Sequence, residues 1–245
     1  MHDITGSVAL VTGASRGIGR GIAEALGRAG VHIAVGYVTR ETEAREVVEG
    51  IEANGRRAVA IRADVSRKDN VERLVAEADR ALGPITILVN NAAVLGSPAS
   101  ANRSYDDEWE WVLATNLTSA FRLIEAVLPS MRNAGWGRIV NITSVAAQTA
   151  GGAGPHYAAS KAGLIGLTHC YAGHLAPSGI TVNALSPAFF PTEMLTVELG
   201  VTTPERTPVR HFGRFDEAGE TVVLLARNGF ITGQTINVNG GYLMS

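Results

Sequence analysis

The sequence has few of the residues that mark disulfide-rich proteins or metal sites. Its 245 residues include one cysteine, Cys170, so neither an internal disulfide nor a cysteine metal cluster can form. Cys170 lies in an apolar helical pattern, and we interpret it as a small packing residue. The histidines, at positions 2, 32, 156, 169, 174 and 211, show no metal-ligand spacing with acidic or cysteine partners. We therefore expect no metal site.

Strong charge and long apolar runs are also lacking. The formal net charge is -2, and the lysines and arginines are scattered, which argues against a nucleic-acid partner. No run of 18 or more apolar residues occurs, and the first residues, MHDITGSVALVTG, contain no charged leader followed by a long apolar segment and a cleavage site. We expect a soluble, cytoplasmic protein that acts on a small molecule and not at a membrane.

Short β-branched runs alternate with longer helical patterns along the whole chain. Such alternation predicts a parallel sheet covered by helices on both faces, and the length fits a single domain, 1–245. The fold class is therefore α/β, with a doubly wound sheet. Residues 186–215 hold four of the nine prolines and predict a long loop, which we interpret as a substrate lid. The predicted strands are 8–12, 31–38, 57–65, 85–92, 137–143, 179–186 and 234–239.

The run from Thr12 to Gly19, TGASRGIG, joins the first predicted strand to a helical pattern. Glycines let the backbone turn tightly and approach a pyrophosphate, and the helix N-terminus faces the anion. The run predicts a dinucleotide phosphate site; the alternative is a tight turn without a ligand. The candidate contacts are Gly13, Ser15, Arg16, Gly17, Ile18 and Gly19.

The end of the second predicted strand, Gly36 to Arg40, bears on the choice of dinucleotide. NAD sites place an acidic residue about 20 positions after the glycines, where its charge repels a 2'-phosphate. This run contains no acid, and Arg16 and Arg40 can bind a 2'-phosphate, so we favour NADP(H) over NAD(H). The alternative for Arg40 is the solvated start of a helix. Tyr37 and Thr39 are further candidates at this edge.

Tyr157 and Lys161 are four residues apart in a helical pattern, so their side chains share a face. A neighbouring cation favours the phenolate and brings the pKa of a phenol, usually ~10, toward the range of acid–base catalysis. Ser144 ends a predicted strand, and the glycine-rich stretch 151–154 can fold back to bring its hydroxyl beside the phenol. Alone, such a Tyr-Lys pair is typical of a solvated surface; together with the other motifs it predicts a catalytic group.

The motifs together resemble the short-chain dehydrogenase/reductase family over nearly the whole chain. The resemblance implies an oxidoreductase with a Rossmann-like fold. It also implies a homotetramer whose subunits pack through the helix that carries Asn116 and the helix that carries Tyr157. The motifs are TGASRGIG at 12–19, Asp64-Val65, NNAA at 90–93, Asn116 in TNLTSAF, Ser144, YAASK at 157–161, and Ser186-Pro187 followed by Thr192.

The resemblance implies a role for each catalytic residue. Tyr157 would protonate the carbonyl oxygen as hydride arrives from the nicotinamide, and Ser144 would hold that oxygen by a hydrogen bond. Lys161 would bind the nicotinamide ribose and lower the pKa of the phenol. Asn116 would hold a water that links Lys161 to solvent; its alternatives are a helix kink or a satisfied polar group in the core.

Further cofactor contacts follow from the resemblance. The alternative for Asp64 is a strand-end cap, and the alternative for Asn90 is a turn former. Asn91 and Ala92 are more typical of structural positions, although Ala92 is counted with the cofactor site. The implied contacts are the adenine for Asp64 and Val65, the ribose for Asn90, and the carboxamide for Pro187 and Thr192.

Within the family the chain is most similar to the 3-oxoacyl carrier-protein reductases, through TGASRGIG, YAASKAGLIGLT, GITVNALSP and ITGQTINVNGG. Those reductases often carry basic residues for an acidic carrier before two of the strands. Here these places are residues 134–137 and Pro177-Ser178; Arg132 and Arg138 are nearby but lie elsewhere. Carrier-protein docking is therefore doubtful. Ala93 replaces the usual glycine, and the segment before ITGQ is shorter than usual.

The predicted function is NADP(H)-dependent reduction of a ketone, a 3-oxoacyl thioester or similar carbonyl, to a secondary alcohol. Alternatives are an NAD-dependent alcohol dehydrogenase of the same family and a non-catalytic dinucleotide-binding regulator. We interpret Trp109, Trp111 and Phe121 as core or subunit-interface residues. An apolar lid favours a substrate with a hydrophobic arm, unless the lid only covers a core edge. The predicted substrate wall is Ala188, Phe189, Phe190, Met194 and Leu195, with Val94, Leu95, Gln148 and Ala150 opposite.

Overall fold

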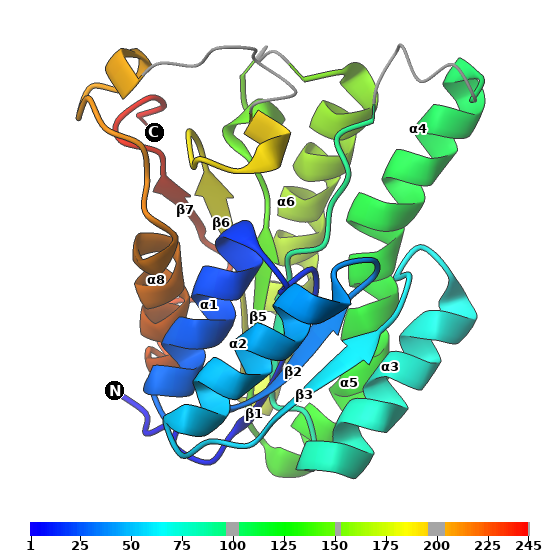
Figure 1. Cartoon of the computed structure of the whole chain (residues 1–245), viewed down its shortest axis with the longest axis vertical. Helices are drawn as coiled ribbons and strands as arrows, with labels where there is room; N and C mark the ends of the chain where they lie inside the picture. Colours follow the sequence, from blue (N-terminus) through cyan, green and yellow to red (C-terminus); the bar gives the residue numbers. More distant parts are fainter. Residues whose placement is uncertain (97–102, 150–152, 196–203, 245) are drawn as a thin grey trace.

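The computed structural model describes residues 1–96, 103–149, 153–195 and 204–244. In this part of the chain seven strands form one parallel sheet in the order β3-β2-β1-β4-β5-β6-β7. The α/β class and the doubly wound parallel sheet are confirmed (Figure 1). The strands are β1 Val8–Val11, β2 His32–Tyr37, β3 Ala58–Arg62, β4 Ile87–Asn90, β5 Gly137–Ile142, β6 Ile180–Pro187 and β7 Thr235–Val238.

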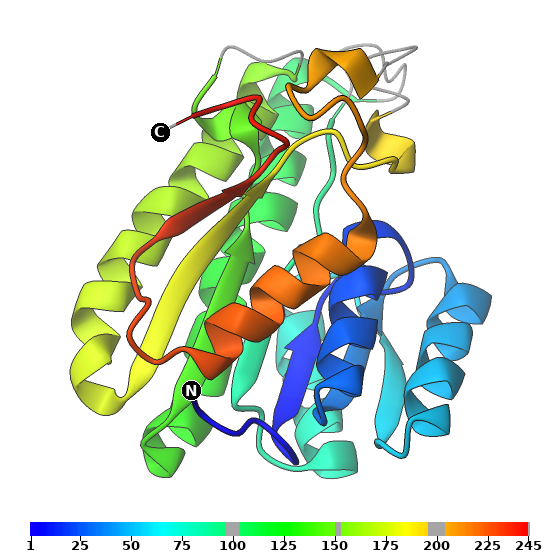
Figure 2. The same ribbon diagram turned by 90° about the vertical axis from the view of Figure 1, so that its left-hand side faces the viewer.

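Helices cover both faces of the sheet. One hydrophobic cluster joins the sheet to α1, α2 and α8, and a second joins it to α3, α5 and α6. Figure 2 shows α8 lying beside α1 on the first face. The helices are α1 Gly17–Arg28, α2 Glu41–Ala53, α3 Lys68–Leu82, α4 Tyr105–Leu113, α5 Ser119–Ala134, α6 Pro155–Leu175 and α8 Phe215–Arg227, with short turns η1 Ala114–Thr118, η2 Val145–Ala147, η3 Ala176–Ser178 and η4 Pro204–Arg206.

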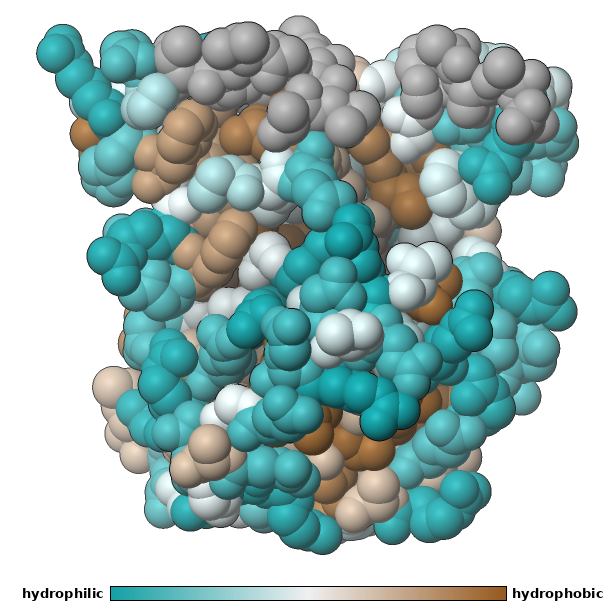
Figure 3. Space-filling view, viewed as in Figure 1, coloured by the Kyte–Doolittle hydropathy of each residue, from teal (hydrophilic) through white to brown (hydrophobic). Residues whose placement is uncertain are grey.

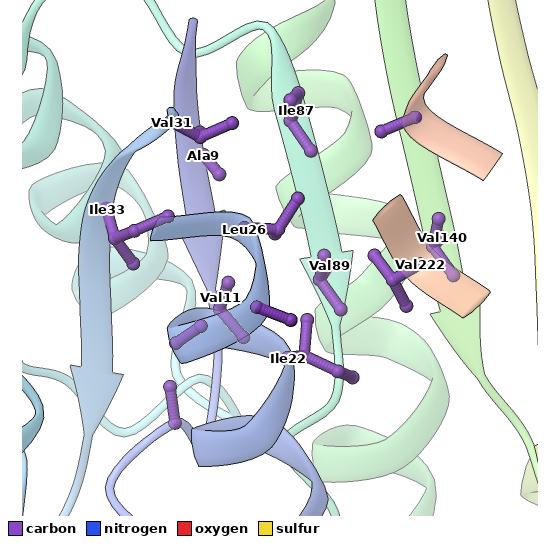
Figure 4. Packing of buried hydrophobic residues seen from close by; sticks show 14 of the residues in the cluster. Ala9, Val11, Ile22, Leu26, Val31, Ile33, Ile87, Val89, Val140 and Val222 are labelled. Carbon is purple, nitrogen blue, oxygen red and sulfur yellow. The ribbon is translucent and has the colours of Figure 1, made fainter. Parts of the chain in front are cut away.

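The central strand β1 shows why the strand runs are apolar throughout. Its side chains alternate between the two clusters: Ala9 and Val11 face α1, α2 and α8, and Val8 and Leu10 face the other layer. Figure 4 shows Val11 packed near Ile22 of α1. Each fully buried aliphatic side chain contributes about 1.5–3 kcal/mol of hydrophobic free energy, so a strand covered on both faces retains almost no polar positions.

The strand order reverses between β1 and β4, which lie side by side with Val11 opposite Val89. The chain leaves β1 toward β2 and leaves β4 toward β5, so this pair is the topological switch point of the sheet, where a ligand crevice is expected. In open α/β sheets, ligands bind at this crevice beyond the carboxyl ends of the strands. The predicted glycine turn follows β1, and Asn90 ends β4.

The helix from Tyr105 to Ala134 is continuous but contains a π-helical turn, η1. It is long and apolar enough to cross a membrane by length and composition alone, yet half of its most apolar window is buried inside the protein, as in core helices. Trp109 is 38% exposed and Phe121 47% exposed, so these two rings do not lie in the core of the subunit. The prediction of a subunit interface for them stays a prediction.

Cys170 is exposed, so its prediction as a packing residue was wrong. The buried positions of α6 include Leu164, Thr168 and Ala172, which form a stripe at helical spacing. Residue 170 falls outside that stripe. Its Sγ instead lies 3.5 Å from Nδ1 of His174, one turn along the same helix. The uniformly apolar sequence around it hid which face is buried.

Candidate active site

The structure brings Tyr157 and Lys161 together on the buried face of the first turns of α6. Tyr157 is 7% exposed and Lys161 2% exposed. The Nζ of Lys161 lies 5.6 Å from the centroid of the Tyr157 ring, so the predicted shared face is present. Their pairing is internal and not a solvated surface pair, because both side chains are held under the carboxyl edge of the sheet.

The ammonium group of Lys161 is held by backbone. Its Nζ donates a hydrogen bond of 2.8 Å to the carbonyl oxygen of Ile142, at the end of β5. Burial lowers the pKa of Lys161 to about 7. At neutral pH this lysine therefore lies close to the point where it gives up its proton, which suits a group that exchanges protons during a reaction.

Asn116 lies in the π-helical turn η1 and is almost fully buried. Its Oδ1 accepts a 2.8 Å bond from the Val94 amide, and its Nδ2 donates to the Val94 carbonyl at 2.9 Å and to the Ser160 hydroxyl at 3.0 Å. Ser160 in turn donates to the carbonyl oxygen of Tyr157. Asn116 thus ties the segment after β4 to the first turn of α6. π-Helical turns are frequent at functional sites.

Ser144 follows β5 in extended conformation, and its hydroxyl accepts a 3.1 Å bond from the Ala146 amide at the start of η2. Ser144 and Tyr157 both line a hollow of about 130 Å3 at the carboxyl edge of the sheet. Figure 3 shows hydrophobic residues in the recessed upper part of the molecule, above this edge. The hydroxyl and the phenol, which lie far apart in the sequence, therefore face one apolar space.

The apolar wall was predicted in part. Ala188, Phe189, Phe190, Met194 and Leu195 all line the hollow. Three residues predicted opposite them, Val94, Leu95 and Gln148, are not part of its lining, and Ala150 lies outside the described residues. The backbone of Val94 is held by Asn116, which keeps this segment against the helix layer.

Two residues that line the hollow gave no signal in the sequence. Arg206 comes from η4, and Tyr242 comes from the segment after β7. The Arg206 guanidinium lies 5.4 Å from the centroid of the Phe189 ring, and the Tyr242 ring meets Phe189 edge-on at 4.8 Å between centroids. Phe189 itself has a φ of 54°, a conformation uncommon outside glycine and enriched at functional sites.

The glycine turn after β1 adopts backbone conformations that favour glycine. Gly13 and Gly17 have φ values of 63° and 57°. A Cβ on Gly19 would lie 2.4 Å from the carbonyl oxygen of Gly13, so no other residue fits. The N-cap of α1, Arg16, makes no side-chain capping bond. The first amides of α1 are thus left without a side-chain cap, which is the usual arrangement at an anion site.

Arg16 and Arg40 converge on one carboxylate, that of Glu193. Arg16 pairs with Oε2 of Glu193, and Nη2 of Arg40 lies 3.1 Å from both of its oxygens. The hydrogen bond from Arg16 holds the pKa of Glu193 below its usual range. Arg40 also bonds Glu43 of α2. Arg16 and Arg40, the two residues predicted to bind a 2'-phosphate, therefore form one cationic site, and Glu193 of the predicted lid segment occupies it.

Several predicted cofactor residues have other contacts. The side chains of Tyr37, at the end of β2, and Val65, in the turn after β3, pack in the two hydrophobic clusters, and their cofactor contacts stay predictions. Asp64 accepts bonds from the amide and hydroxyl of Ser66, as its strand-end cap alternative expects. The amide of Ala92 donates to the Thr12 hydroxyl, and Thr39 is exposed.

Asn91 and Asn90 lie side by side but have different surroundings. The Asn91 side chain bonds the carbonyls of Thr12 and Gly13, in keeping with a structural position. Asn90 donates to Oδ1 of Asn141, yet its own buried Oδ1 has no hydrogen-bond partner. A buried acceptor without a partner is costly, and this one lies at the carboxyl end of β4, next to Asn141 of β5.

The predicted carboxamide turn reaches the glycine turn. Pro187 ends β6 opposite Val238 of β7, and the Thr192 amide donates to the carbonyl of Phe190. A Cβ added to Gly17 would lie 3.4 Å from the methyl of Thr192, so the start of α1 and this turn are neighbours. Among the described residues, no group of three histidine, cysteine or acidic side chains could hold a metal ion.

Comparison with known proteins identifies the family. The family model described as short chain dehydrogenase matches residues 7–199. The chain is 41% identical over 241 residues to a 3-oxoacyl-[acyl-carrier-protein] reductase FabG of Staphylococcus epidermidis (96% of this chain and 98% of that protein) and 41% identical over 249 residues to the protein of that name from Pseudomonas aeruginosa (99% and 100%).

A solved structure supports the same conclusion. A blue fluorescent protein from a metagenomic library, in complex with NADPH, superposes with a TM-score of 0.90 at 35% identity, over 99% of this chain and 100% of that one. The chain belongs to the short-chain dehydrogenase family and is an oxidoreductase.

Proposed function

We propose that this protein reduces a ketone to a secondary alcohol at the expense of NADPH. The observation that carries the proposal is the meeting of the Ser144 hydroxyl and the Tyr157 phenol on one apolar hollow, with the buried Lys161 next to Tyr157. A ketone that enters the hollow finds one hydroxyl to hold its oxygen and one acid to protonate it.

The residues of the β1–β4 crevice fit a nicotinamide dinucleotide. The uncapped start of α1 and Gly19 suit its phosphates, and Asn90, at the end of β4, would support the ribose. The bound cofactor would supply the hydride. Pro187 and Thr192 would hold the carboxamide.

The chain's own residues manage the proton. Ser144 donates a hydrogen bond to the carbonyl oxygen, and Tyr157 transfers its phenolic proton to that oxygen as it becomes an alkoxide. The protonated Lys161 stabilises the phenolate that remains. Because burial lowers the pKa of Lys161 to about 7, the lysine can pass a proton back to Tyr157 near neutral pH. The role of Asn116 is to hold the route from Lys161 to solvent.

The cofactor preference rests on Arg16 and Arg40. Two guanidinium groups that converge on one carboxylate would bind a 2'-phosphate more strongly, because a phosphate carries more charge and an additional oxygen. The 2'-phosphate would displace Glu193. NAD(H) has no group for this site, so we infer a preference for NADP(H).

The substrate class follows from the hollow. Its wall of phenylalanine, methionine and leucine side chains suits a carbonyl compound with a hydrophobic arm, such as a 3-oxoacyl thioester. The names of the Staphylococcus and Pseudomonas relatives point in the same direction. We propose no docking site for a carrier protein on this chain. The exposed rings of Trp109 and Phe121 support a homotetramer, and we infer a cytoplasmic enzyme.

The test is the oxidation of NADPH with a panel of ketones that includes a 3-oxoacyl thioester, on the wild type and on Tyr157→Phe. We expect the variant to bind NADPH as the wild type does and to turn over about 10²- to 10⁴-fold more slowly, because only the proton donor is lost. Equal turnover would refute the role of Tyr157. Tight NADPH binding by the wild type without turnover on any ketone would favour the dinucleotide-binding regulator.

A further inference from the structure

A second buried cation lies at the opposite edge of the sheet. Arg138, near the amino end of β5, is 2% exposed and is among the largest fully buried side chains of the protein. It forms no ion pair with any described residue, and burial lowers its pKa. A guanidinium group nevertheless keeps its proton at all ordinary pH values. Its charge is therefore buried without a compensating carboxylate in the described chain.

The backbone fixes the position of this guanidinium group. Its Nε donates to the carbonyl of Ala226 at 2.9 Å, and its Nη1 donates to Gly137 at 2.7 Å and to Gly179 at 3.2 Å. One face lies against the Trp136 ring, 4.5 Å from its centroid. The remaining nitrogen, Nη2, has no hydrogen bond to a described residue. The two N–H groups of Nη2 are therefore held in a fixed direction by the bonds of the other two nitrogens.

That nitrogen faces a hollow. A cavity of about 200 Å3 lies among Arg138, Trp136, His2, Thr181 and the short connection between α8 and β7, which includes Gly229 and Thr232. Figure 2 shows the N-terminus beside the C-terminal end of α8, at the lower edge of the sheet, and His2 donates its amide to Arg227 there. Since a water takes about 30 Å3 of liquid, the cavity can hold a small anion together with water.

A second side chain of the cavity is also unsatisfied. Thr181 is 5% exposed, and its buried hydroxyl has no hydrogen-bond partner. His2 approaches from the other side, with its Nε2 2.8 Å from the position of a Cβ built on Gly229. The same Cβ would lie 3.1 Å from Nη2 of Arg138. The Arg138 guanidinium and the His2 imidazole therefore meet beside Gly229, and Thr181 lines the same cavity.

We propose that this cavity, formed by Arg138, Thr181, His2 and Gly229, is a binding site for a small oxyanion such as inorganic phosphate or a carboxylate. An oxyanion there compensates the Arg138 charge and accepts hydrogen bonds from Nη2 and from the Thr181 hydroxyl. Its binding stabilises the folded chain by mass action, because the unfolded chain has no such site. The site lies at the amino edge of the sheet, away from the catalytic hollow.

The test measures the melting temperature of the full chain in inorganic phosphate and in chloride at equal ionic strength. We expect phosphate at ten times its dissociation constant to raise the melting temperature by about 3–5 °C. Gly229→Ala should abolish this rise, because its methyl group blocks Nη2. Gly229 does not have a positive φ, so alanine fits the backbone. Gly50→Ala is the matched control, since a Cβ there meets nothing within 4 Å.

Two further variants test the Thr181 hydroxyl and the competing phosphate site at Arg16. Thr181→Val should weaken the effect of phosphate without blocking the cavity, which tests the hydroxyl even if Arg138→Met fails to fold. Phosphate can also bind Arg16 and Arg40, so Arg16→Glu must keep most of the shift. A shift that survives Gly229→Ala and Thr181→Val, or one that only Arg16→Glu removes, would overturn the proposal, as would equal melting in phosphate and chloride.

Discussion

Lys161 and Arg138 are buried to the same extent, and both donate to backbone carbonyl oxygens without a described carboxylate beside them. Burial lowers the pKa of each. The lysine reaches a pKa of about 7 and can lose its charge, whereas the arginine stays protonated. A cation that can discharge suits the proton transfer proposed at the carboxyl edge of the sheet, and a cation that cannot discharge needs an anion. The same burial therefore has opposite consequences at the two edges of the sheet.

The sharpest test of this contrast is the pH dependence of unfolding. Above the ordinary lysine pKa of 10.5, Lys161 is neutral in both the folded and the unfolded chain. Between that pH and about 7 the unfolded chain binds a proton at Lys161 that the folded chain does not bind. The contribution of Lys161 to the free energy of unfolding therefore rises with pH over this range. The slope from this one proton is at most about 1.4 kcal/mol per pH unit. We expect Lys161→Met to remove it in denaturant titrations between pH 7 and 10.

Arg138→Met is the matched control for Lys161→Met. Since the guanidinium group remains charged throughout this pH range, the variant should shift the free energy of unfolding by a constant amount and leave the slope as in the wild type. A slope that Arg138→Met removes, or that Lys161→Met retains, would break the comparison.

A third group of cations, Arg16 and Arg40, is exposed and extends the comparison to the surface. Arg16→Glu should weaken NADPH about 10- to 100-fold more than NADH, because it removes a charge-assisted bond to the 2'-phosphate and adds repulsion. Paired fluorescence titrations of the two cofactors measure this ratio. Equal losses for both cofactors would mean that Arg16 does not read the 2'-phosphate.

The smallest expected effect is at Glu193. Exposed ion pairs contribute little, so Glu193→Gln should leave the melting temperature nearly unchanged. It should tighten NADPH about two- to five-fold and NADH hardly at all, since the carboxylate no longer competes for the two arginines. Tightening of both cofactors alike would show that Glu193 acts on the crevice in another way.

Much of the catalytic group could be read from the sequence because its parts depend on local geometry. The four-residue spacing of Tyr157 and Lys161 places them on one helix face whatever the surroundings, and the glycines of 12–19 can only serve a turn that other residues cannot adopt. The alternation of strands and helices fixes a doubly wound sheet through the handedness of its crossovers.

Other positions depended on contacts between distant segments. Tyr242 and Arg206 meet Phe189 only after β6 and β7 pair. Cys170 was misjudged because an apolar helix does not reveal which face it buries. Burial of Tyr37 at the end of β2 likewise follows from the sheet and from α2 packed on it, and not from its local sequence.

The sequence by itself determined the fold class, the glycine turn after β1 and the family of this protein, because periodicity, glycine and a few short motifs act over neighbouring residues. Only the tertiary structure decided which charges have partners. It brought Glu193 to Arg16 and Arg40, buried Lys161 beside the Tyr157 ring, and left Arg138 beside a hollow. Charge compensation and burial arise between segments far apart in the chain, and no local pattern records them.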